Sequence, residues 1–304
     1  MYKRFCALLI FVLSCCAATK LNAQHSFSVN NGAEMEKFQD SLLRINEAVF
    51  NAQDNAERFA LNARFIKSLV NSLKTHSSFS YPFDSLKRIS IIKSADNSFR
   101  IFSWHLPTDD GTYRFFGAIQ IATSDGKLKL YPLIDNTENI KDPNQVTGNK
   151  MWYGATYYEI VPVITSGRQP YYVLLGWKGN NSKTSKKVIE ILSFVKDEPV
   201  FGKAVFSNSN DKNRIIFEYN KLNTMTLKTD KNVGMIVFDH LAPFTPEMEG
   251  NFEYYASDSS FDAYKIVNAK LKLVENIELK NDPNAQDELY ADPNDKTNRP
   301  ARKL

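Results

Sequence analysis

After residue 16 the chain contains no cysteine, because its three cysteines are Cys6, Cys15 and Cys16. The rest of the chain therefore cannot form disulfide bonds or a cysteine-ligated metal site. It also lacks a second long apolar run, since no segment after the N-terminus approaches the roughly 20 apolar residues of a membrane-crossing helix. We therefore expect no transmembrane segment after the signal is removed, and a fold held together by its hydrophobic core alone.

A large excess of charge of one sign is missing as well. The chain carries 38 basic and 34 acidic residues, a net charge of +4. Removing Lys3, Arg4 and Lys20 with the first 23 residues would leave 35 basic residues against the same 34 acidic ones. Because such a balance gives no general attraction to nucleic acids or anionic lipids, we expect no nucleic-acid partner.

The sequence also lacks the short motifs that mark common cofactor and catalytic sites. There is no phosphate-binding P-loop, no dinucleotide fingerprint, no G-x-S-x-G elbow and no H-E-x-x-H zinc motif. The four histidines, His25, His76, His105 and His240, lie far apart in the sequence. We therefore predict neither a metal site nor a cofactor, and the sequence leaves any catalytic residues unknown.

Residues 1–23 are typical of an export signal peptide. Lys3 and Arg4 precede an apolar core, small and polar residues follow, and Ala23 suits the last position before a cleavage site. A second processing route stays open, because residues 12–15 loosely match a lipoprotein box in which Cys15 would be acylated. The choice decides between a free and a tethered protein, since two or more fatty chains anchor a protein stably.

Residues 34–75 are expected to form an antiparallel helical hairpin. Apolar residues recur every three or four positions from Met35 to Val49 and again from Ala56 to Leu73. Between the two stripes, Asp54 stands three residues before Glu57, as in a capping box. We expect the hairpin to cover one face or end of a sheet, with a partner-binding helical arm as the alternative.

Residues 86–277 have the pattern of short β-strands separated by turns. Asp-Gly and similar pairs lie between apolar runs, for example at 109–111 and 124–126, and they favour β-hairpins. A weak repeat divides this part into three units, at 86–134, 152–206 and 214–277, each with four strands. The predicted fold is mainly β and antiparallel, either propeller-like or one strongly curved sheet. Propellers usually need four to eight blades to form a closed ring, so the sequence does not decide whether three units close into one. The polar tail, 281–304, is expected to be disordered or loosely attached.

The second strand of each unit ends in aromatic or ionisable residues. These are Trp104 and His105 in the first unit, Trp177 in the second, and Asp239 and His240 in the third. If the units are equivalent, these five residues lie on one face of the β domain and form a ligand-binding site. The alternative is a structural role, with His240 hydrogen-bonded at a strand end. Neighbours on a strand point to opposite faces, so Asp239 is not expected to orient His240.

Paired aromatic residues recur along the predicted strands, as at Tyr171 and Tyr172. On a strand with one buried face, one ring of such a pair faces the core and the other faces solvent. Exposed rings of this kind can stack against sugars or peptide side chains. Ordinary packing of aromatic pairs across the sheet is the alternative.

Residues 152–162, 171–179, 238–243 and 252–265 resemble segments of a set of exported β-rich proteins of Bacteroidota to which no activity is assigned. The junction of Ala23 and Gln24 is also similar to signal cleavage sites common there. The resemblance implies a Gram-negative cell envelope, hence the periplasm or an association with the outer membrane. It transfers no functional residue.

Three functions are compatible with these features. The first is a non-enzymatic envelope protein that binds a ligand or protein partner through the five-residue face. The second is a periplasmic hydrolase with His240 or His105 as general base. The third is a structural subunit of an envelope assembly. The ligand and the oligomeric state stay open.

Overall fold

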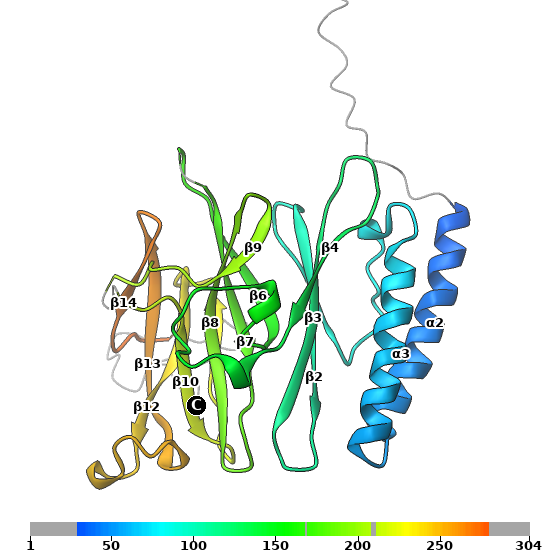
Figure 1. Ribbon diagram of the computed structural model, residues 1–304. Helices are drawn as coiled ribbons and strands as arrows, with labels where there is room; N and C mark the ends of the chain where they lie inside the picture. The colour runs from blue at the N-terminus through cyan, green and yellow to red at the C-terminus, as the bar shows by residue number, and fades with distance from the viewer. Residues whose placement is uncertain (1–28, 168, 208–210, 280–304) are drawn as a thin grey trace, which may run out of the picture.

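The computed structural model describes residues 29–167, 169–207 and 211–279. The predicted signal peptide, Cys15 and the polar tail at 281–304 lie outside these residues. Within them, four layers follow one another: a helical hairpin, then three antiparallel sheets (Figure 1). The three sheets stack as layers and close into neither a ring nor a barrel. The prediction of a mainly β, antiparallel fold with an N-terminal helical hairpin is confirmed.

The hairpin consists of α2, Val29–Asn51, and α3, Asn55–Leu73. The Asp54 carboxylate accepts a hydrogen bond of 2.8 Å from the backbone N–H of Glu57, which caps the start of α3. In return the Glu57 carboxylate accepts one from the backbone N–H of Gln53 at 2.9 Å. The predicted cap is therefore formed.

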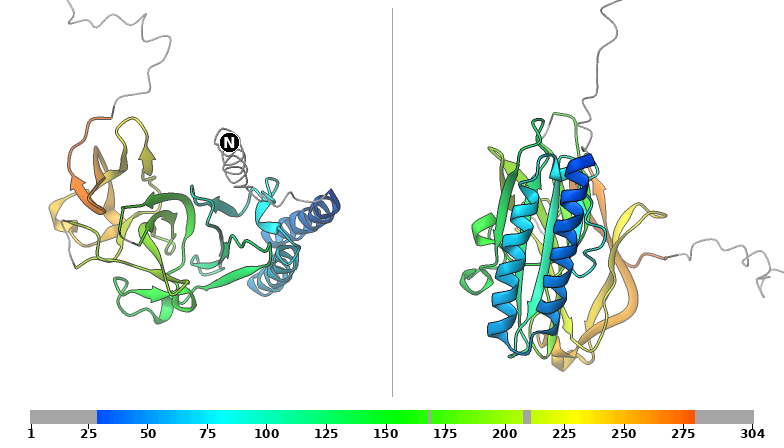
Figure 2. Two further views of the ribbon diagram at one scale, coloured as in Figure 1. Left: turned by 90° about the horizontal axis from the view of Figure 1, so that it is seen from above. Right: turned by 90° about the vertical axis from the view of Figure 1, so that its right-hand side faces the viewer.

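Both helices cover one face of the first sheet (Figure 2). Met35, Leu42 and Val49 of α2 are buried there, as the periodicity predicts. On α3 the most deeply buried apolar residues are Phe65, Leu69 and Leu73. The stripe predicted from Ala56 to Leu73 runs through Phe59 and Ile66, which are only partly buried. This shift arises because α3 contacts both α2 and the sheet, so its apolar surface spreads over two neighbours.

The first sheet has the order β1-β2-β3-β4, with strands Ser90–Lys93, Phe99–Pro107, Tyr113–Ile121 and Lys129–Ile134. In β2 the side chains alternate between two cores. Phe102, Trp104 and Leu106 face the helices, while Phe99 and Ile101 face the second sheet. Burial on both faces explains why β2 is a nearly continuous apolar run.

The second sheet has the order β5-β9-β8-β7-β6, and β10 also pairs with β8. Its strands are Thr147–Gly148, Thr156–Val163, Tyr171–Trp177, Thr184–Val195, Glu198–Phe201 and Ile215–Asn220 for β5 to β10 in chain order. The prediction placed the strand at β10 in the third unit, 214–277. The structure corrects this, because β10 belongs to the second sheet. The cause is the length of β8: β9 pairs with residues 192–195 of β8, and β10 pairs with residues 184–189 of the same strand.

The third sheet has the order β11-β12-β13-β14, with strands Leu227–Asp230, Met235–Pro243, Tyr255–Val267 and Lys270–Val274. Its inner face packs on the second sheet through Ile236, Phe238 and Tyr264. Short 3₁₀ helices lie in the described connections at Ser78–Ser80, Thr137–Asn139, Asn149–Met151, Pro246–Met248 and Phe252–Tyr254. The three predicted repeats therefore correspond to three sheets, and β2, β7 and β12 are the predicted second strands.

Because the second sheet lies between the other two, its central strands are buried on both faces. Tyr171 packs in the core shared with the third sheet and Tyr172 in the core shared with the first. Each is only 3% exposed, so the expectation that one ring of this pair faces solvent is wrong. In the described residues neither helix is long and apolar enough to cross a membrane.

Candidate functional site

The five residues chosen from the sequence lie in three different places. Trp104 faces the helices, where its indole N–H donates a hydrogen bond of 2.9 Å to the Asn62 side chain of α3. Its ring stacks on Phe116 and meets Phe65 edge-on. Trp104 therefore joins the hairpin to the first sheet and points away from His105, its neighbour on β2.

His105 and Trp177 do come together, in the core between the first two sheets. Their ring centroids are 4.4 Å apart, and Tyr113 packs edge-on against both. The Nδ1 atom of His105 lies 3.0 Å from the Thr156 hydroxyl. Burial lowers the pKa of His105 to about 4, so the ring is neutral at physiological pH. At the ends of β2 and β7, the rings of His105, Trp177 and Tyr113 therefore fill the space between the two sheets by packing on one another.

Asp239 and His240 lie in the third sheet and make separate contacts. The buried Asp239 carboxylate accepts a hydrogen bond of 2.8 Å from the backbone N–H of Thr226. His240 lies in a register shift between β12 and β13, and its Nδ1 is 2.8 Å from the Asp262 carboxylate. As predicted, Asp239 does not orient His240; Asp262, which the sequence did not indicate, does.

The expectation that all five residues share one face is therefore not met, because Trp104 and the third-sheet pair lie apart from His105 and Trp177. The His240–Asp262 pair is nevertheless accessible, since the His240 side chain is 48% exposed. The hydrogen bond that the His240 imidazole donates to the Asp262 carboxylate raises the pKa of His240 above its ordinary value, while burial acts in the opposite direction. Asp262 is itself held by the backbone N–H of Asn276 at 3.0 Å.

A better-formed hollow lies at the other ends of the same strands. We call it the Asp96 groove; it measures about 330 Å³ and is lined by Asp96, Ser98, Phe99, Ile121, Lys129, Pro170, Tyr172, Phe194 and Asp197. It runs between the first two sheets, where β2 and β7 begin. Pockets that hold small ligands generally start at about this volume.

The floor of the Asp96 groove is aromatic. Phe99 and Tyr172 meet edge-on with centroids 4.7 Å apart, and Phe194 meets Phe99 in the same way at 5.2 Å. Phe99 and Tyr172 are almost fully buried, so they are fixed by the core below. Such a surface favours an apolar or aromatic group laid against it.

The rim of the groove is ionic. The Tyr172 hydroxyl donates a hydrogen bond of 2.6 Å to the Asp96 carboxylate, and the Ser98 hydroxyl and backbone N–H donate two more. Although partial burial acts in the opposite direction, hydrogen bonds from Ser94, Tyr172 and Ser98 lower the pKa of Asp96 to about 2. Lys129 and Asp197 add an ion pair of 3.4 Å. The three ionic groups together carry one net negative charge.

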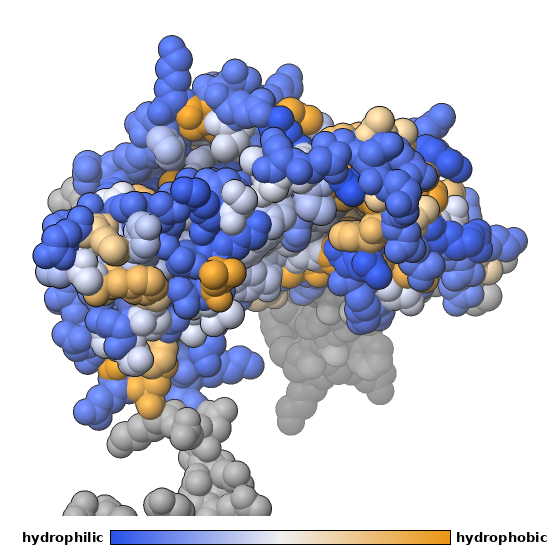
Figure 3. All heavy atoms as spheres, turned by 90° about the horizontal axis from the view of Figure 1, so that it is seen from below, coloured by the Kyte–Doolittle hydropathy of each residue, from blue (hydrophilic) through white to orange (hydrophobic). Residues whose placement is uncertain are grey.

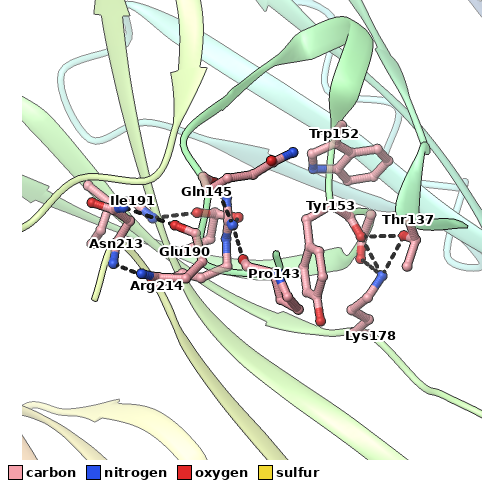
Figure 4. Close-up of polar contacts among 12 residues, drawn as sticks. Thr137, Pro143, Gln145, Trp152, Tyr153, Lys178, Glu190, Ile191, Asn213 and Arg214 are labelled. Carbon is pink, nitrogen blue, oxygen red and sulfur yellow. Dashed lines mark hydrogen bonds and ion pairs between the residues drawn. The ribbon is translucent and has the colours of Figure 1, made fainter. Parts of the chain in front are cut away.

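A second concentration of charge is buried beside the connection from the first to the second sheet (Figure 4). In Figure 4, Tyr153 lies between Lys178 and Arg214, whose charged groups are 4.1 and 5.3 Å from its ring centroid. Arg214 forms an ion pair of 2.9 Å with Glu190, and both side chains are 0% exposed. Buried ionisable groups with perturbed pKa values are found both at active sites and in structural networks.

The contacts of these cations are mainly with backbone oxygens. The Lys178 ammonium donates to the Thr137 hydroxyl and to the carbonyls of Tyr153 and Gly154. The Arg214 guanidinium donates to the carbonyls of residues 143 and 145. Burial lowers the pKa of Lys178 to about 7, while Asp135 acts in the opposite direction. The arrangement stabilises an irregular segment of chain, and Arg214 also lines a hollow of about 380 Å³ together with Asp142, Pro143, Asn144, Asp211, Lys212 and Ile216.

No group of three or more histidine, aspartate or glutamate side chains in the described chain is placed to hold a metal ion. On the face seen from below, apolar residues form separate spots among hydrophilic ones (Figure 3). Scattered exposed apolar residues are usual on protein surfaces.

Sequence reasoning missed the Asp96 groove although its parts were visible. Asp96 and Asp197 each lie in a turn, and Tyr172 belongs to a noted aromatic pair. Only the packing of the first sheet on the second brings these turns to the same aromatic floor. Comparisons of the chain with known protein families, with curated proteins and with solved structures gave no match.

Proposed function

We propose that this protein is an exported binding module of the cell envelope, and that the Asp96 groove holds its ligand. The single observation that carries the proposal is an ionised carboxylate fixed at the edge of a three-ring aromatic floor. The ligand class that suits this groove is a small molecule with a positively charged group and an apolar body.

The chemistry of the groove supports this class. The Asp96 carboxylate is ionised at physiological pH, and its oxygens can accept a further hydrogen bond from an ammonium. Tyr172 links the two recognition elements, because its ring forms part of the floor and its hydroxyl orients the carboxylate. A ligand group that is both cationic and apolar would satisfy both at once.

The groove also has room that the predicted face lacks. At the far ends of β2 and β7, His105 and Trp177 pack on each other and on Tyr113. Ligand binding there would require these rings to separate, whereas the Asp96 groove is open without rearrangement. The proposal therefore keeps the ligand-binding function and moves its site to the other end of the same strands.

The test uses three probes of nearly equal shape: phenethylamine, which is cationic, 2-phenylethanol, which is neutral, and phenylacetate, which is anionic. Binding is measured by calorimetry and by backbone amide shifts. We expect phenethylamine to bind best and Asp96→Asn to weaken its binding by at least about tenfold, since a hydrogen bond to a charged group contributes about 1.5–3 kcal/mol.

The matched control is Asp110→Asn. Asp110 is also a turn aspartate whose pKa is lowered to about 2, by hydrogen bonds from Thr108 and Thr112, and it lies at the opposite end of the first sheet. This substitution should leave phenethylamine binding unchanged. Equal binding of all three probes, or equal loss in both variants, would contradict the proposal.

Export is part of the proposal and has its own measurement. N-terminal analysis of the mature protein should find Gln24 as the first residue. A lipidated Cys15 would replace soluble export by tethering, and a retained Met1 would contradict export altogether.

A second candidate function rests on the His240–Asp262 pair. A half-exposed histidine with Nδ1 bonded to a buried carboxylate leaves Nε2 to act as a general base in a hydrolase. In this case turnover of an ester or glycoside library should be lost in His240→Gln and should rise with pH as the imidazole deprotonates. Turnover that survives His240→Gln would exclude this role.

A further inference from the structure

A second hollow opens on the other side of the second sheet. We call it the Lys203 hollow; it measures about 330 Å³ and is lined by Thr165, Gln169, Tyr171, Lys203, Ala204, Val205, Ala269 and Lys270. It lies where the β6–β7 hairpin, the segment after β9 and the turn between β13 and β14 meet. Tyr171 and Tyr172 are adjacent on β7, so they line the Lys203 hollow and the Asp96 groove on opposite faces of one strand.

The charge of the Lys203 hollow is opposite to that of the Asp96 groove. Among the described residues that line it, the ionic groups are Lys203 and Lys270, and none is a carboxylate. No acidic side chain of the described residues lies within 4 Å of either ammonium, the distance at which an ion pair is recognised. Lys270 donates one hydrogen bond of 3.0 Å, to the Ala204 carbonyl, which leaves donors for an incoming group.

The position of Lys270 is fixed by a strained turn. Asn268 and Ala269 have φ angles of +51° and +58°, a left-handed conformation that costs roughly 1–2 kcal/mol for a residue such as alanine. The Tyr171 hydroxyl holds this turn by donating a hydrogen bond of 2.9 Å to the Ala269 carbonyl. Strain that is held in place by the surroundings is often found at binding sites.

The same hairpin carries further positive charge. Lys265 and Lys272 stand directly opposite each other on β13 and β14, and both are exposed. Like charges in this position destabilise a sheet unless a counter-charge is near. The β13–β14 hairpin that supplies Lys270 therefore carries two more exposed lysines.

We propose that the Lys203 hollow binds a phosphate monoester. The two ammonium groups would share the doubly charged phosphate, with the Thr165 hydroxyl and the Gln169 amide as neutral partners and the Tyr171 ring beside the organic part. Lysine is a common phosphate ligand because its compact charge attracts the anion from several directions. This site is independent of the Asp96 groove, since it takes a ligand of the opposite charge.

The test titrates the full mature protein with glycerol 3-phosphate, inorganic phosphate and glycerol at low salt, following amide shifts. Glycerol 3-phosphate should bind more tightly than inorganic phosphate, and glycerol should not bind. Lys203→Met and Lys270→Met should each weaken binding about tenfold, and the double variant should abolish it. Tyr171→Phe, which frees the Ala269 carbonyl, should weaken binding several-fold without removing either charge.

The control is Lys127→Met, because Lys127 lies in an exposed turn of the first sheet and is 81% exposed. It should bind glycerol 3-phosphate like the unaltered protein. Urea unfolding of each variant separates loss of the site from loss of the fold. Equal binding of glycerol and glycerol 3-phosphate, unchanged binding in the double variant, or no binding at millimolar concentration would overturn the proposal.

Two sources could supply the phosphate monoester, and vesicles distinguish them. Sedimentation with phosphatidic acid vesicles, but not with phosphatidylcholine vesicles, would identify a lipid headgroup when it is lost in the double lysine variant. Binding of soluble glycerol 3-phosphate without vesicle binding would identify a free metabolite. Phenethylamine binding in the Asp96 groove should be the same in all lysine variants, so failure of one site does not imply failure of the other.

Discussion

Replacing Lys178 by methionine tests whether a buried ammonium controls how stability depends on pH. Lys178 is 5% exposed and donates to the Thr137 hydroxyl and two backbone carbonyls. Burial lowers its pKa from an ordinary 10.5 to about 7. The methionine variant keeps a chain of similar volume and removes the titrating group.

The sign of the effect follows from counting protons. Between pH 7 and 10.5 the folded protein has released the Lys178 proton while the unfolded chain still holds it. Because the unfolded state then binds more protons, the free energy of unfolding rises with pH, by up to about 1.4 kcal/mol per pH unit. From pH 7 to 9 the rise attributable to Lys178 is about 2 kcal/mol.

The assay is urea unfolding followed by tryptophan fluorescence at pH 7, 8 and 9. The range ends at 9 because burial raises the pKa of tyrosines such as Tyr153, and these groups act in the opposite direction near pH 10. The difference in slope between the two proteins isolates Lys178, and the exposed Lys127→Met should keep the original slope. Equal slopes in the original protein and Lys178→Met would refute the reasoning.

Two further substitutions test the same region by urea unfolding. Glu190→Gln should cost about 3–5 kcal/mol because it leaves the wholly buried Arg214 without its counter-charge. Glu138→Gln, which breaks an exposed ion pair with Arg114, should cost about 1 kcal/mol or less. Similar costs in the two variants would contradict this. Gly154→Ala should lower the free energy of unfolding more than Gly167→Ala. Both glycines have φ near +70°, but a Cβ at residue 154 would lie 2.8 Å from the Asp135 carboxylate, whereas one at residue 167 would meet nothing within 4 Å. Equal losses of stability would show that this clash does not matter.

The parts of the fold predicted from sequence are those that depend on neighbouring residues. The cap at Asp54, the period of the helices and the turns between strands are all local signals, and they gave the helical hairpin and the antiparallel strands. The repeat of an apolar second strand also identified β2, β7 and β12. β2 and β7 are buried on both faces, and β12 is buried from residue 236 to residue 239, which makes each apolar run long enough to recognise.

What the sequence did not predict depends on distant pairing. The strand that begins at Ile215 joins the second sheet because β8 extends beyond β9, and no local signal states that length. The partner of His240 is Asp262, 22 residues away, which a register shift between β12 and β13 brings into contact. The Asp96 groove exists only because two sheets pack together, so its residues could be recognised as turns but not as a site.

The buried charges near Tyr153 show why perturbed groups alone do not locate a binding site in this protein. The connection from the first sheet to the second, residues 135–155, is largely irregular, and its backbone polar groups must find partners away from water. Lys178, Arg214 and Asp135 supply these partners: the two cations donate to its carbonyls, and the Asp135 carboxylate accepts from the backbone N–H groups of Phe115 and Thr137. In a chain without cysteine after residue 16, such side-chain bonds fix a segment that a disulfide could otherwise hold. These backbone contacts account for the burial of Lys178 and hence for its lowered pKa, without a ligand.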